Sequence, residues 1–352
     1  MRIKTFQKYT SRKFWRNKTV LITGINGFVG GNLAKHLLSC GAIIIGITNS
    51  NKKNKFLKFE NIIDKIKLHT VDIKNYDKLS KIFSLYKIDI CFHLAAQVDV
   101  NIARLNPYNT FETNIKGTYN LLELLRNHDS IKSIIIASSD KAYGEYKSQD
   151  LPYTEKHDLR PIYPYDVSKA SADLISKSYS SNLYKMPIII TRFANIFGPG
   201  QLNFTALIPD CILANLGYRK FIPRGSGVNK RDFLFVDDVS DLYICLAYNL
   251  CNEKKFIGEV YNAGTGDGYR VKDIIKKICS LNNNKKLYDE IKKDLRNKKL
   301  IGEITHQFMN HKKISKDFNW MPKHNLEDGL MKSIIWYKKF LKTYSYKYFI
   351  DK

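Results

Sequence analysis

The stretch from Thr19 to Gly41 constrains the fold more than any other part of the chain. It begins with TVLIT, an apolar run with the length and composition of a buried strand. The run leads directly into GINGFVGGNLAKHLLSCG, where Gly24, Gly27 and Gly30 are spaced by three residues ahead of an amphipathic helical pattern. Glycines allow a sharp turn and a close backbone approach, and a helix N-terminus offers free N–H groups to a phosphate. The stretch therefore predicts a loop that binds the pyrophosphate of a dinucleotide.

The same alternation of apolar runs and helical patterns continues beyond this loop. Short, largely apolar runs recur at residues 42–47, 90–94 and 134–136, and amphipathic segments of helical length separate them. Strands that alternate with helices pair in parallel, with helices on both faces of the sheet. We therefore expect an α/β fold built on a Rossmann-type, doubly wound parallel sheet.

The pattern becomes irregular after about Phe197. Strand–loop–helix segments still occur there, but no linker of distinctive composition separates the two halves. We expect residues 1–196 to form the dinucleotide-binding domain, with returns to its sheet near residues 229–263. Residues 197–345 would then form most of a smaller, interleaved C-terminal lobe that binds the substrate.

Composition excludes several classes of protein. The 352 residues carry a formal net charge of +25, but the lysines are spread widely and no known nucleic-acid-binding motif accompanies them, so we expect no nucleic-acid partner. No apolar run approaches the roughly 18 residues that cross a bilayer, so we expect no membrane association. The basic start of the chain lacks the apolar core of a secretory signal.

The cysteines indicate a reducing compartment. They form no Cys-x-x-Cys pair and most fall within apolar patterns, as expected of buried, reduced thiols in a cytoplasmic protein. They are Cys40, Cys91, Cys211, Cys245, Cys251 and Cys279. No cluster of His, Cys and carboxylate residues has the spacing of metal ligands, so we expect no metal site.

A second stretch suggests catalysis. It reads KSIIIASSDKAYG and continues, after a loop, with YDVSKASADLI. Ser139, Asp140 and Lys141 follow a buried strand, and Tyr165 and Lys169 lie one turn apart on a helix face. An ammonium there would stabilise a tyrosinate, and lowering a tyrosine pKa from ~10 to ~7 takes roughly 4 kcal/mol. Tyr-x-x-x-Lys also arises by chance, and Asp140–Lys141 could be a surface ion pair, but the preceding glycine loop favours catalysis.

The remaining strand ends predict how a dinucleotide would be held. Asp72 and Ile73 follow the third strand and are placed to meet an adenine ring, with the carboxylate accepting a hydrogen bond from the adenine amino group. Ala95 and Ala96 end the fourth strand and would let the backbone lie close to the cofactor. We expect Asn114 to face back toward this end of the sheet.

The second strand leaves the choice of cofactor open. It ends in Thr48-Asn49-Ser50, without the acidic residue that binds an adenosine 2′-hydroxyl. Lys52 and Lys53 follow, and a 2′-phosphate could favour them. This loop therefore does not distinguish NAD from NADP.

These motifs together resemble the extended short-chain dehydrogenase/reductases that modify nucleotide sugars, along nearly the whole chain. The matching motifs are TGINGFVG, VDI, HLAAQ, NIKGT, SSDKAYG, YDVSK, RFANIFGPG, RDFLFVDD and FNWMPKHNLEDGL. The resemblance implies an NAD-dependent enzyme with a nucleotide-diphosphate sugar as substrate. The implied cofactor-binding residues are Gly24, Gly27, Phe28, Val29, Gly30, Asp72, Ile73, Leu94, Ala95, Ala96, Asn114, Tyr165 and Lys169.

The resemblance also implies substrate contacts from Gln97, Asn195, Leu207 and Arg231. Asn195 could instead be a turn residue ahead of the glycines, and Arg231 could instead form a structural pair with Asp232 or Asp237. The resemblance further implies a homodimer, formed by the helix around residues 114–125 and the helix that begins at Tyr165. The apolar faces of these helices could equally belong to the core.

The SSDKAYG segment is similar to that of CDP-glucose 4,6-dehydratases. By this resemblance, Tyr165 and Lys169 would support oxidation at carbon 4 of the sugar, with Ser139 on the same oxygen. Lys141 would remove the proton of carbon 5 while Asp140 protonates the leaving hydroxyl of carbon 6. The alternatives are a 4-epimerase or a keto-sugar reductase that uses only the first three residues, and a non-catalytic nucleotide-binding or scaffold member of the family.

Overall fold

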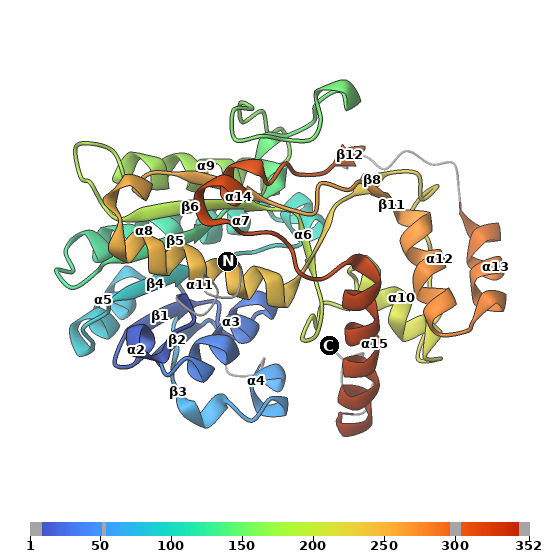
Figure 1. The fold of residues 1–352 in the computed structure, drawn as a ribbon, viewed down its shortest axis with the longest axis horizontal. Coiled ribbons are helices and arrows are strands. Elements are labelled where there is room, and N and C mark those ends of the chain that lie inside the picture. Colours follow the sequence, from blue (N-terminus) through green and yellow to red (C-terminus); the bar gives the residue numbers. More distant parts are fainter. Residues whose placement is uncertain (1–8, 51–53, 296–303, 345–352) are drawn as a thin grey trace.

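The computed structural model describes residues 9–50, 54–295 and 304–344 (Figure 1). Its centre is a sheet of seven strands, and every pairing in the sheet is parallel. In spatial order the strands are β10 (Val260–Ala263), β6 (Ile188–Phe193), β5 (Ser133–Ala137), β4 (Ile90–His93), β1 (Thr19–Thr23), β2 (Ile43–Thr48) and β3 (Ile66–Thr70). The strand runs are rich in isoleucine and, except in the edge strand β3, nearly all buried, as expected of a parallel sheet covered on both faces. The predicted α/β sheet is confirmed.

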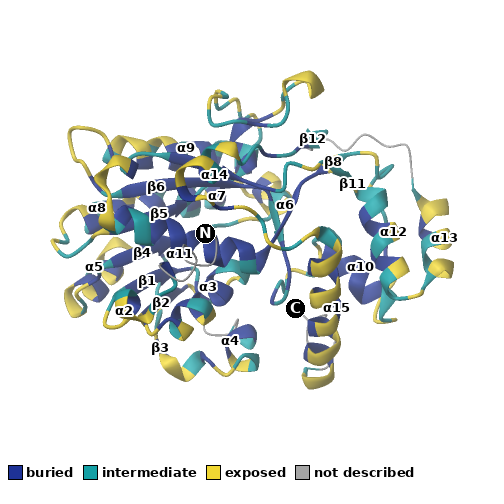
Figure 2. Ribbon diagram, viewed as in Figure 1, coloured by how far each residue is buried: buried dark blue, intermediate teal, exposed yellow. Residues whose placement is uncertain are grey.

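Helices cover both faces of the sheet. Alternate residues of β1 point to opposite sides: Val20 and Ile22 pack in one apolar cluster with Leu33, whereas Leu21 packs in another with Leu121. The first face carries α3 (Phe28–Ser39) and α11 (Val236–Asn252), and the second carries α5 (Tyr76–Leu85), α8 (Gly117–Arg126) and α9 (Pro164–Tyr179). Figure 2 shows the strands buried between these helices, whose outer surfaces are exposed. The doubly wound arrangement is therefore also confirmed.

The order of the strands determines where a ligand can bind. β1 lies between β2 and β4, so the chain winds in opposite directions on the two sides of β1. In open parallel sheets, ligands bind at the carboxyl ends of the strands next to such a reversal. The connections that leave this edge include α6 (Val100–Leu105), α7 (Pro107–Phe111), a π-helical turn (Glu112–Lys116) and a 3₁₀ turn (Asp140–Tyr143).

A second group of elements lies beyond the carboxyl edge of the sheet, at the right of Figure 1. Its helices are α10 (Leu207–Asn215), α12 (Val271–Leu281), α13 (Lys285–Asp294) and α15 (Leu326–Thr343). One small sheet pairs β7 (Asn195–Phe197) with β9 (Phe233–Phe235), and another consists of β11 (Tyr269–Arg270), β8 (Lys230–Arg231) and β12 (His306–Gln307). Because β10 and α11 return to the main sheet, the two groups are interleaved along the chain.

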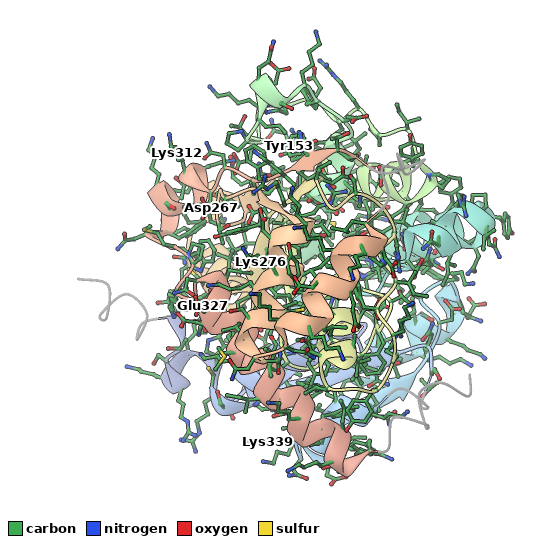
Figure 3. The ribbon with its side chains drawn as sticks, turned by 90° about the vertical axis from the view of Figure 1, so that its right-hand side faces the viewer. Tyr153, Asp267, Lys276, Lys312, Glu327 and Lys339 are labelled. Carbon is green, nitrogen blue, oxygen red and sulfur yellow. The ribbon has the colours of Figure 1, made fainter. Side chains whose placement is uncertain are left out.

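Three further short α-helices lie among the described residues, together with 3₁₀ turns at Ile63–Lys65, Ser148–Asp150 and Lys254–Phe256. The three α-helices are α2 (Arg12–Trp15), α4 (Lys55–Phe59) and α14 (Lys312–Phe318). Figure 3 turns the α12 and α15 side toward the viewer, and the labelled Lys276, Lys312 and Lys339 lie far apart on it. The neighbouring Lys277 pairs with Glu327, with 2.5 Å between Nζ and Oε2.

Candidate active site

The glycine loop lies between β1 and α3, as predicted, and its glycines are required by close backbone packing. Gly24 has a φ of +74°, and a Cβ there would lie 2.8 Å from the backbone of Ala95. A Cβ on Gly30 would collide with the carbonyl group of Gly24. Gly27 is the N-cap of α3 and has no side chain to occupy the free N–H groups of the first turn. Phe28 and Val29 are the first residues of the helix. Because no side chain caps its N-terminus, the backbone N–H groups of the first turn are available to a phosphate.

An asparagine that the sequence analysis did not single out supports the end of β2. The Asn26 side chain donates hydrogen bonds from Nδ2 to Thr48 Oγ1 (3.1 Å) and to the Ser50 carbonyl oxygen (3.0 Å). Its Oδ1 is buried and, within the described part of the chain, has no hydrogen-bond partner. This orphaned acceptor lies beside the end of β2, and it suits a ribose hydroxyl. Lys52 and Lys53 lie outside the described residues.

The third strand leads to Asp72 and Ile73. The Asp72 carboxylate accepts a hydrogen bond from the Lys74 backbone N–H at 2.9 Å and lies 3.5 Å from Lys74 Nζ. Its side chain is 45% exposed, so it remains accessible to a ligand. Ile73 is buried, and its side chain packs against Gly117 of α8, where a Cβ would collide with it.

The end of β4 is held by polar side chains from several elements. Thr23 Oγ1 accepts hydrogen bonds from the backbone N–H groups of Leu94 and Ala95, each at 3.2 Å. His93 bridges Thr23 Oγ1 (2.8 Å) and Thr118 Oγ1 (3.0 Å), and burial lowers the pKa of His93 to about 3. His93 is therefore a neutral structural residue. Ala96 lines the cavity described below.

Asn114 connects this strand end to α9. Its Nδ2 donates to Ser168 Oγ at 2.8 Å and to the Gln97 carbonyl oxygen at 3.0 Å, while its Oδ1 accepts from the Gln97 N–H at 2.8 Å. The Gln97 side chain binds the Asp99 backbone and Thr110 Oγ1. Described residues that line the cavity include the neighbours of Gln97 but not Gln97 itself. Gln97 therefore stabilises a loop rather than contacting the cavity.

One cavity of about 870 Å³ brings the predicted catalytic residues together between the sheet edge and the second group of elements. Its walls include Ser139, Asp140, Lys141, Tyr165 and Lys169. The first three lie on the turn after β5, and the other two lie on the first turns of α9, where Pro164 at the N-terminus starts the helix. Two separate segments therefore meet at one site.

The side chains of Tyr165 and Lys169 lie in a desolvated environment. Tyr165 is buried, and burial raises its pKa above the ordinary value, whereas a hydrogen bond with Ser139 opposes that shift. Burial also lowers the pKa of Lys169 to about 8, although the charge of Asp173 opposes it. Lys169 Nζ donates to the Ala137 carbonyl oxygen at 2.6 Å. Burial therefore outweighs the lowering of the Tyr165 pKa that the sequence predicts.

Asp140 and Lys141, the two residues after Ser139, lie in a different environment. Burial raises the pKa of Asp140, and the positive charges of Lys141 and Arg231 oppose this shift together with a Ser139 hydrogen bond. Ser139 Oγ donates to Asp140 Oδ1 at 3.0 Å. Lys141 Nζ donates to Gln307 Oε1 at 3.3 Å. Asp140 is buried, so the pair is not a surface ion pair.

The far wall of the cavity contains the remaining predicted substrate residues, Asn195, Leu207 and Arg231. Asn195 Nδ2 donates to the Asp232 carbonyl oxygen at 3.2 Å. Arg231 Nη1 donates to the carbonyl oxygens of Lys230 (2.9 Å) and Thr305 (3.1 Å). Leu207 begins α10.

The acids considered as partners of Arg231 have other contacts. The Asp232 carboxylate accepts hydrogen bonds from Thr265, Gly266 and Met309. Asp237 pairs with His36, with 3.6 Å between Oδ1 and Nε2.

Sequence reasoning missed several polar residues of the same wall. They come from the irregular segments around α10 and ahead of β8, where no periodic pattern indicates which side chains face inward. They are Asn203, Thr205, Asp210, Arg224 and Asn229. Of these, Asp210 forms an ion pair with Arg219, with 3.0 Å between Oδ1 and Nε, and Arg224 Nη2 donates to the Thr205 carbonyl oxygen at 2.8 Å.

Within residues 9–50, 54–295 and 304–344, no group of three or more His, Cys, Asp or Glu side chains is arranged to hold a metal ion. No helix within these ranges is both long and apolar enough to cross a membrane.

Comparison with known proteins places this site in a family. A family model described as GDP-mannose 4,6 dehydratase matches residues 21–333. A dTDP-D-glucose 4,6-dehydratase of Dictyostelium discoideum is 34% identical over 279 residues, which is 74% of this chain and 62% of that protein. The chain spans about half the length of other curated relatives that it matches.

Solved structures agree with this match. A Bacillus anthracis dTDP-glucose 4,6-dehydratase in complex with NAD has a TM-score of 0.78 and 28% identity, covering 92% of this chain and 97% of that one. A Thermotoga maritima UDP-glucose 4-epimerase with UDP-glucose has a TM-score of 0.81 and 27% identity, covering 92% and 99%. Dehydratases and epimerases are thus both among the relatives.

Proposed function

Because the chain belongs to the GDP-mannose 4,6-dehydratase family, which lies among the nucleotide-sugar dehydratases and epimerases of the extended short-chain dehydrogenase/reductases, we propose that it is a nucleotide-sugar 4,6-dehydratase. It converts a nucleotide-diphosphate hexose, CDP-glucose or a similar sugar, to the 4-keto-6-deoxy sugar. The observation that carries this proposal is the position of Asp140 and Lys141 in the same cavity as Ser139, Tyr165 and Lys169. An oxidoreductase acting at carbon 4 alone needs only the last three.

NAD fits the glycine loop. The crowded Gly24–Gly30 contact, the bare N-cap at Gly27 and the orphaned Asn26 Oδ1 form a cradle for a pyrophosphate and a ribose. Asp72 and Ile73 would hold the adenine, and Leu94 and Ala95 would support the nicotinamide end. When bound, NAD supplies the hydride acceptor for carbon 4 and the hydride donor for carbon 6.

The first half-reaction, oxidation of carbon 4, uses the buried side chains of Tyr165 and Lys169. Tyr165 takes the proton of the carbon 4 hydroxyl, and Ser139 donates a hydrogen bond to the same oxygen as it becomes a ketone. Lys169 in its charged form stabilises the tyrosinate from one helical turn away. A bound ribose would give Lys169 a hydrogen-bond partner in place of the Ala137 carbonyl group.

The second half-reaction, loss of water followed by reduction of carbon 6, uses Lys141 as the base and Asp140 as the acid. A ketone at carbon 4 makes the proton on carbon 5 acidic, and Lys141 removes it in its neutral form. Asp140, which burial favours in the protonated form, gives its proton to the carbon 6 hydroxyl, which leaves as water. Lys141 then returns its proton to carbon 5 as carbon 6 is reduced. The proton held by Tyr165 restores Asp140 through the solvent, so one water is lost and no net oxidation occurs.

The far wall would hold the nucleotide diphosphate. Arg231 carries a buried positive charge, and Asn195 and Leu207 border the same space. Gln97, predicted as a substrate residue, would act indirectly by holding the loop at Asp99. We assign dinucleotide binding to residues 1–196 with returns near 229–263, and substrate binding mainly to residues 197–345.

A homodimer in the cytoplasm is part of the same proposal. The outer faces of α8 and α9 carry exposed apolar side chains, including Tyr119 (40% exposed) and Leu174 (58% exposed). Two copies could cover these faces by pairing their α8 and α9 helices. Light scattering of the purified protein tests the oligomeric state.

A 4-epimerase is the second candidate, because a solved UDP-glucose 4-epimerase superposes as well as the dehydratases do. Incubation with CDP-, dTDP-, UDP- and GDP-hexoses, each with NAD or NADP, separates the two functions. We expect a product lighter by one water that absorbs in base as a 4-keto sugar. An isomer of unchanged mass would instead identify an epimerase. The preferred base and cofactor emerge from the same set of reactions.

A further inference from the structure

The turn that carries Asp140 and Lys141 ends in a fully buried tyrosine. Tyr143 stacks on Tyr153, with 4.9 Å between ring centroids and 9° between ring planes. Its phenol donates a hydrogen bond to Asn262 Oδ1 at 2.7 Å and accepts one from Arg192 Nη1 at 3.0 Å. Burial raises the pKa of Tyr143 to about 12, so the phenol keeps the proton that it donates. Both hydrogen bonds of this hydroxyl are therefore made to groups inside the protein.

Arg192 connects this tyrosine to α9, the helix that carries Tyr165 and Lys169. Its Nε donates to Asp173 Oδ2 at 2.7 Å and its Nη2 donates to Asp173 Oδ1 at 2.9 Å. Asp173 is fully buried on α9, four residues after Lys169, and its charge raises the pKa of Lys169 against burial. A bidentate pair between buried charges has a strongly preferred geometry. One guanidinium thus binds to both segments that carry catalytic residues.

The base of this connection is rigid. Arg192 on β6 and Asn262 on β10 are register partners in the central sheet. Asn262 Nδ2 also donates to the Tyr153 carbonyl oxygen at 3.2 Å, and Tyr153, labelled in Figure 3, donates from its hydroxyl to the Gly144 carbonyl oxygen at 2.6 Å. The Tyr143 side chain therefore cannot shift without breaking its buried hydrogen bond to Asn262 or to Arg192.

We propose that Tyr143 and Arg192 are positioning residues that hold the Asp140–Lys141 turn at the correct distance from Tyr165 and Lys169. Their function is to let elimination follow oxidation on the same bound sugar. This inference depends on the proposed dehydratase function. A displacement of about 1 Å between reacting groups can cost roughly 10²-fold in rate, and a turn connected only by its own backbone would allow such a displacement.

Tyr143→Phe tests the inference because it removes only the hydroxyl and keeps the stacked ring. A single turnover with the best nucleotide hexose is quenched in acid, and the sugars are separated by mass. We expect carbon 4 oxidation within about threefold of the wild-type rate and elimination slowed by roughly 10²-fold. The 4-keto sugar that still carries its carbon 6 hydroxyl should therefore accumulate. Tyr146→Phe is the matched control, since Tyr146 belongs to the same aromatic group but donates to the Asp158 carbonyl oxygen.

Hydrogen–deuterium exchange gives a second readout that does not depend on turnover. In Tyr143→Phe, the backbone of residues 140–144 should exchange faster, whereas the first turns of α9 should exchange as in the wild type. Arg192→Lys keeps a positive charge beside Asp173 but cannot reach both partners, so it should reproduce the accumulation. If Tyr143→Phe folds poorly, this variant carries the test.

The outcomes separate the inference from the function on which it rests. A wild-type enzyme that forms only an isomer would overturn the dehydratase proposal and this inference with it. A wild-type enzyme that releases water, together with variants that slow both half-reactions equally or neither, would overturn the inference alone.

Discussion

Burial acts on Tyr165 and Lys169 at the same time. It raises the pKa of the phenol and lowers that of the ammonium, so each group is pushed toward its neutral form. Proton removal from the substrate needs the phenolate beside a charged lysine. The pH dependence of the reaction should therefore report the charge on Lys169.

We predict that carbon 4 oxidation declines as the pH rises above about 8, where Lys169 loses its proton. Lys169→Arg should move this decline to higher pH, because arginine keeps its charge. Measuring the yield of 4-keto sugar across pH checks the prediction. Lys177→Arg, an exposed position on the same helix, is the control. An unchanged alkaline limb in Lys169→Arg would argue against this role.

Lys141 distinguishes the two candidate functions at the level of one residue. Lys141→Met removes the proposed base for carbon 5, so water loss should slow by roughly 10²–10⁴-fold while carbon 4 oxidation stays within a fewfold. Mass spectrometry of the sugar products measures both. Lys147→Met, at an exposed lysine a few residues away, should have no effect. An equally active Lys141→Met would favour the epimerase.

At the scale of elements, the glycine loop depends on contact between β1, α3 and the end of β4. Gly30→Ala places a methyl group against the Gly24 carbonyl group, so α3 must shift away from the strand. We expect NAD to bind at least about tenfold more weakly, as its phosphates lose the helix N-terminus. Calorimetric titration of NAD tests this. Ser39→Ala, at the opposite end of α3, should bind NAD normally, and normal binding by Gly30→Ala would contradict the cradle.

At the scale of the whole molecule, charged side chains connect α3 and α11 to the segment just ahead of α15. His36 of α3 lies 3.6 Å from both Asp237 and Asp241 of α11, measured to the nearest carboxylate oxygens. Lys323 also pairs with Asp241 at 2.5 Å, and His324 pairs with the neighbouring Asp238 at 2.9 Å.

This network should make stability depend on pH. Burial lowers the pKa of His36, but the two aspartates outweigh burial and raise it to about 9 from an ordinary 6.5. Because the folded value exceeds the unfolded one, the stabilisation is complete below pH 6.5 and is lost as the pH rises through about 9. We expect the wild type to lose on the order of 2 kcal/mol of unfolding free energy across this window.

Urea unfolding of wild type and His36→Gln at about pH 6 and about pH 9 measures the effect. The variant should be less stable at the lower pH and similar to the wild type at the higher one. The same pH dependence in both proteins would show that His36 does not contribute.

Local patterns were sufficient to predict the architecture. An apolar run such as Ile134–Ile136 can be satisfied only inside a covered sheet, and the Gly24–Gly30 spacing suits only a tight turn into a helix. Tyr165 and Lys169 were also predictable as a pair, since helical periodicity alone puts them on one face. These features depend on neighbours in the sequence, which is why a single sequence reveals them.

Contacts between distant segments were not predictable in the same way. Arg192, Asp173 and Tyr143 are unremarkable within their own strand, helix and turn, and only their meeting in the interior makes them a unit. Gln97 was expected at the substrate, but its amide faces Asp99 and Thr110 instead. The same holds for Asn26 of the glycine loop, whose side chain bonds to Thr48 and Ser50 at the end of β2.

The sequence by itself determined the strands, the glycine turn and the residues available for chemistry, because backbone conformation follows from local periodicity and side-chain shape. Only the tertiary structure decided which of those residues share a cavity, and how far burial shifts their pKa values. The reason is that desolvation and polar pairing depend on atoms brought together from the whole chain, and no local pattern contains that information.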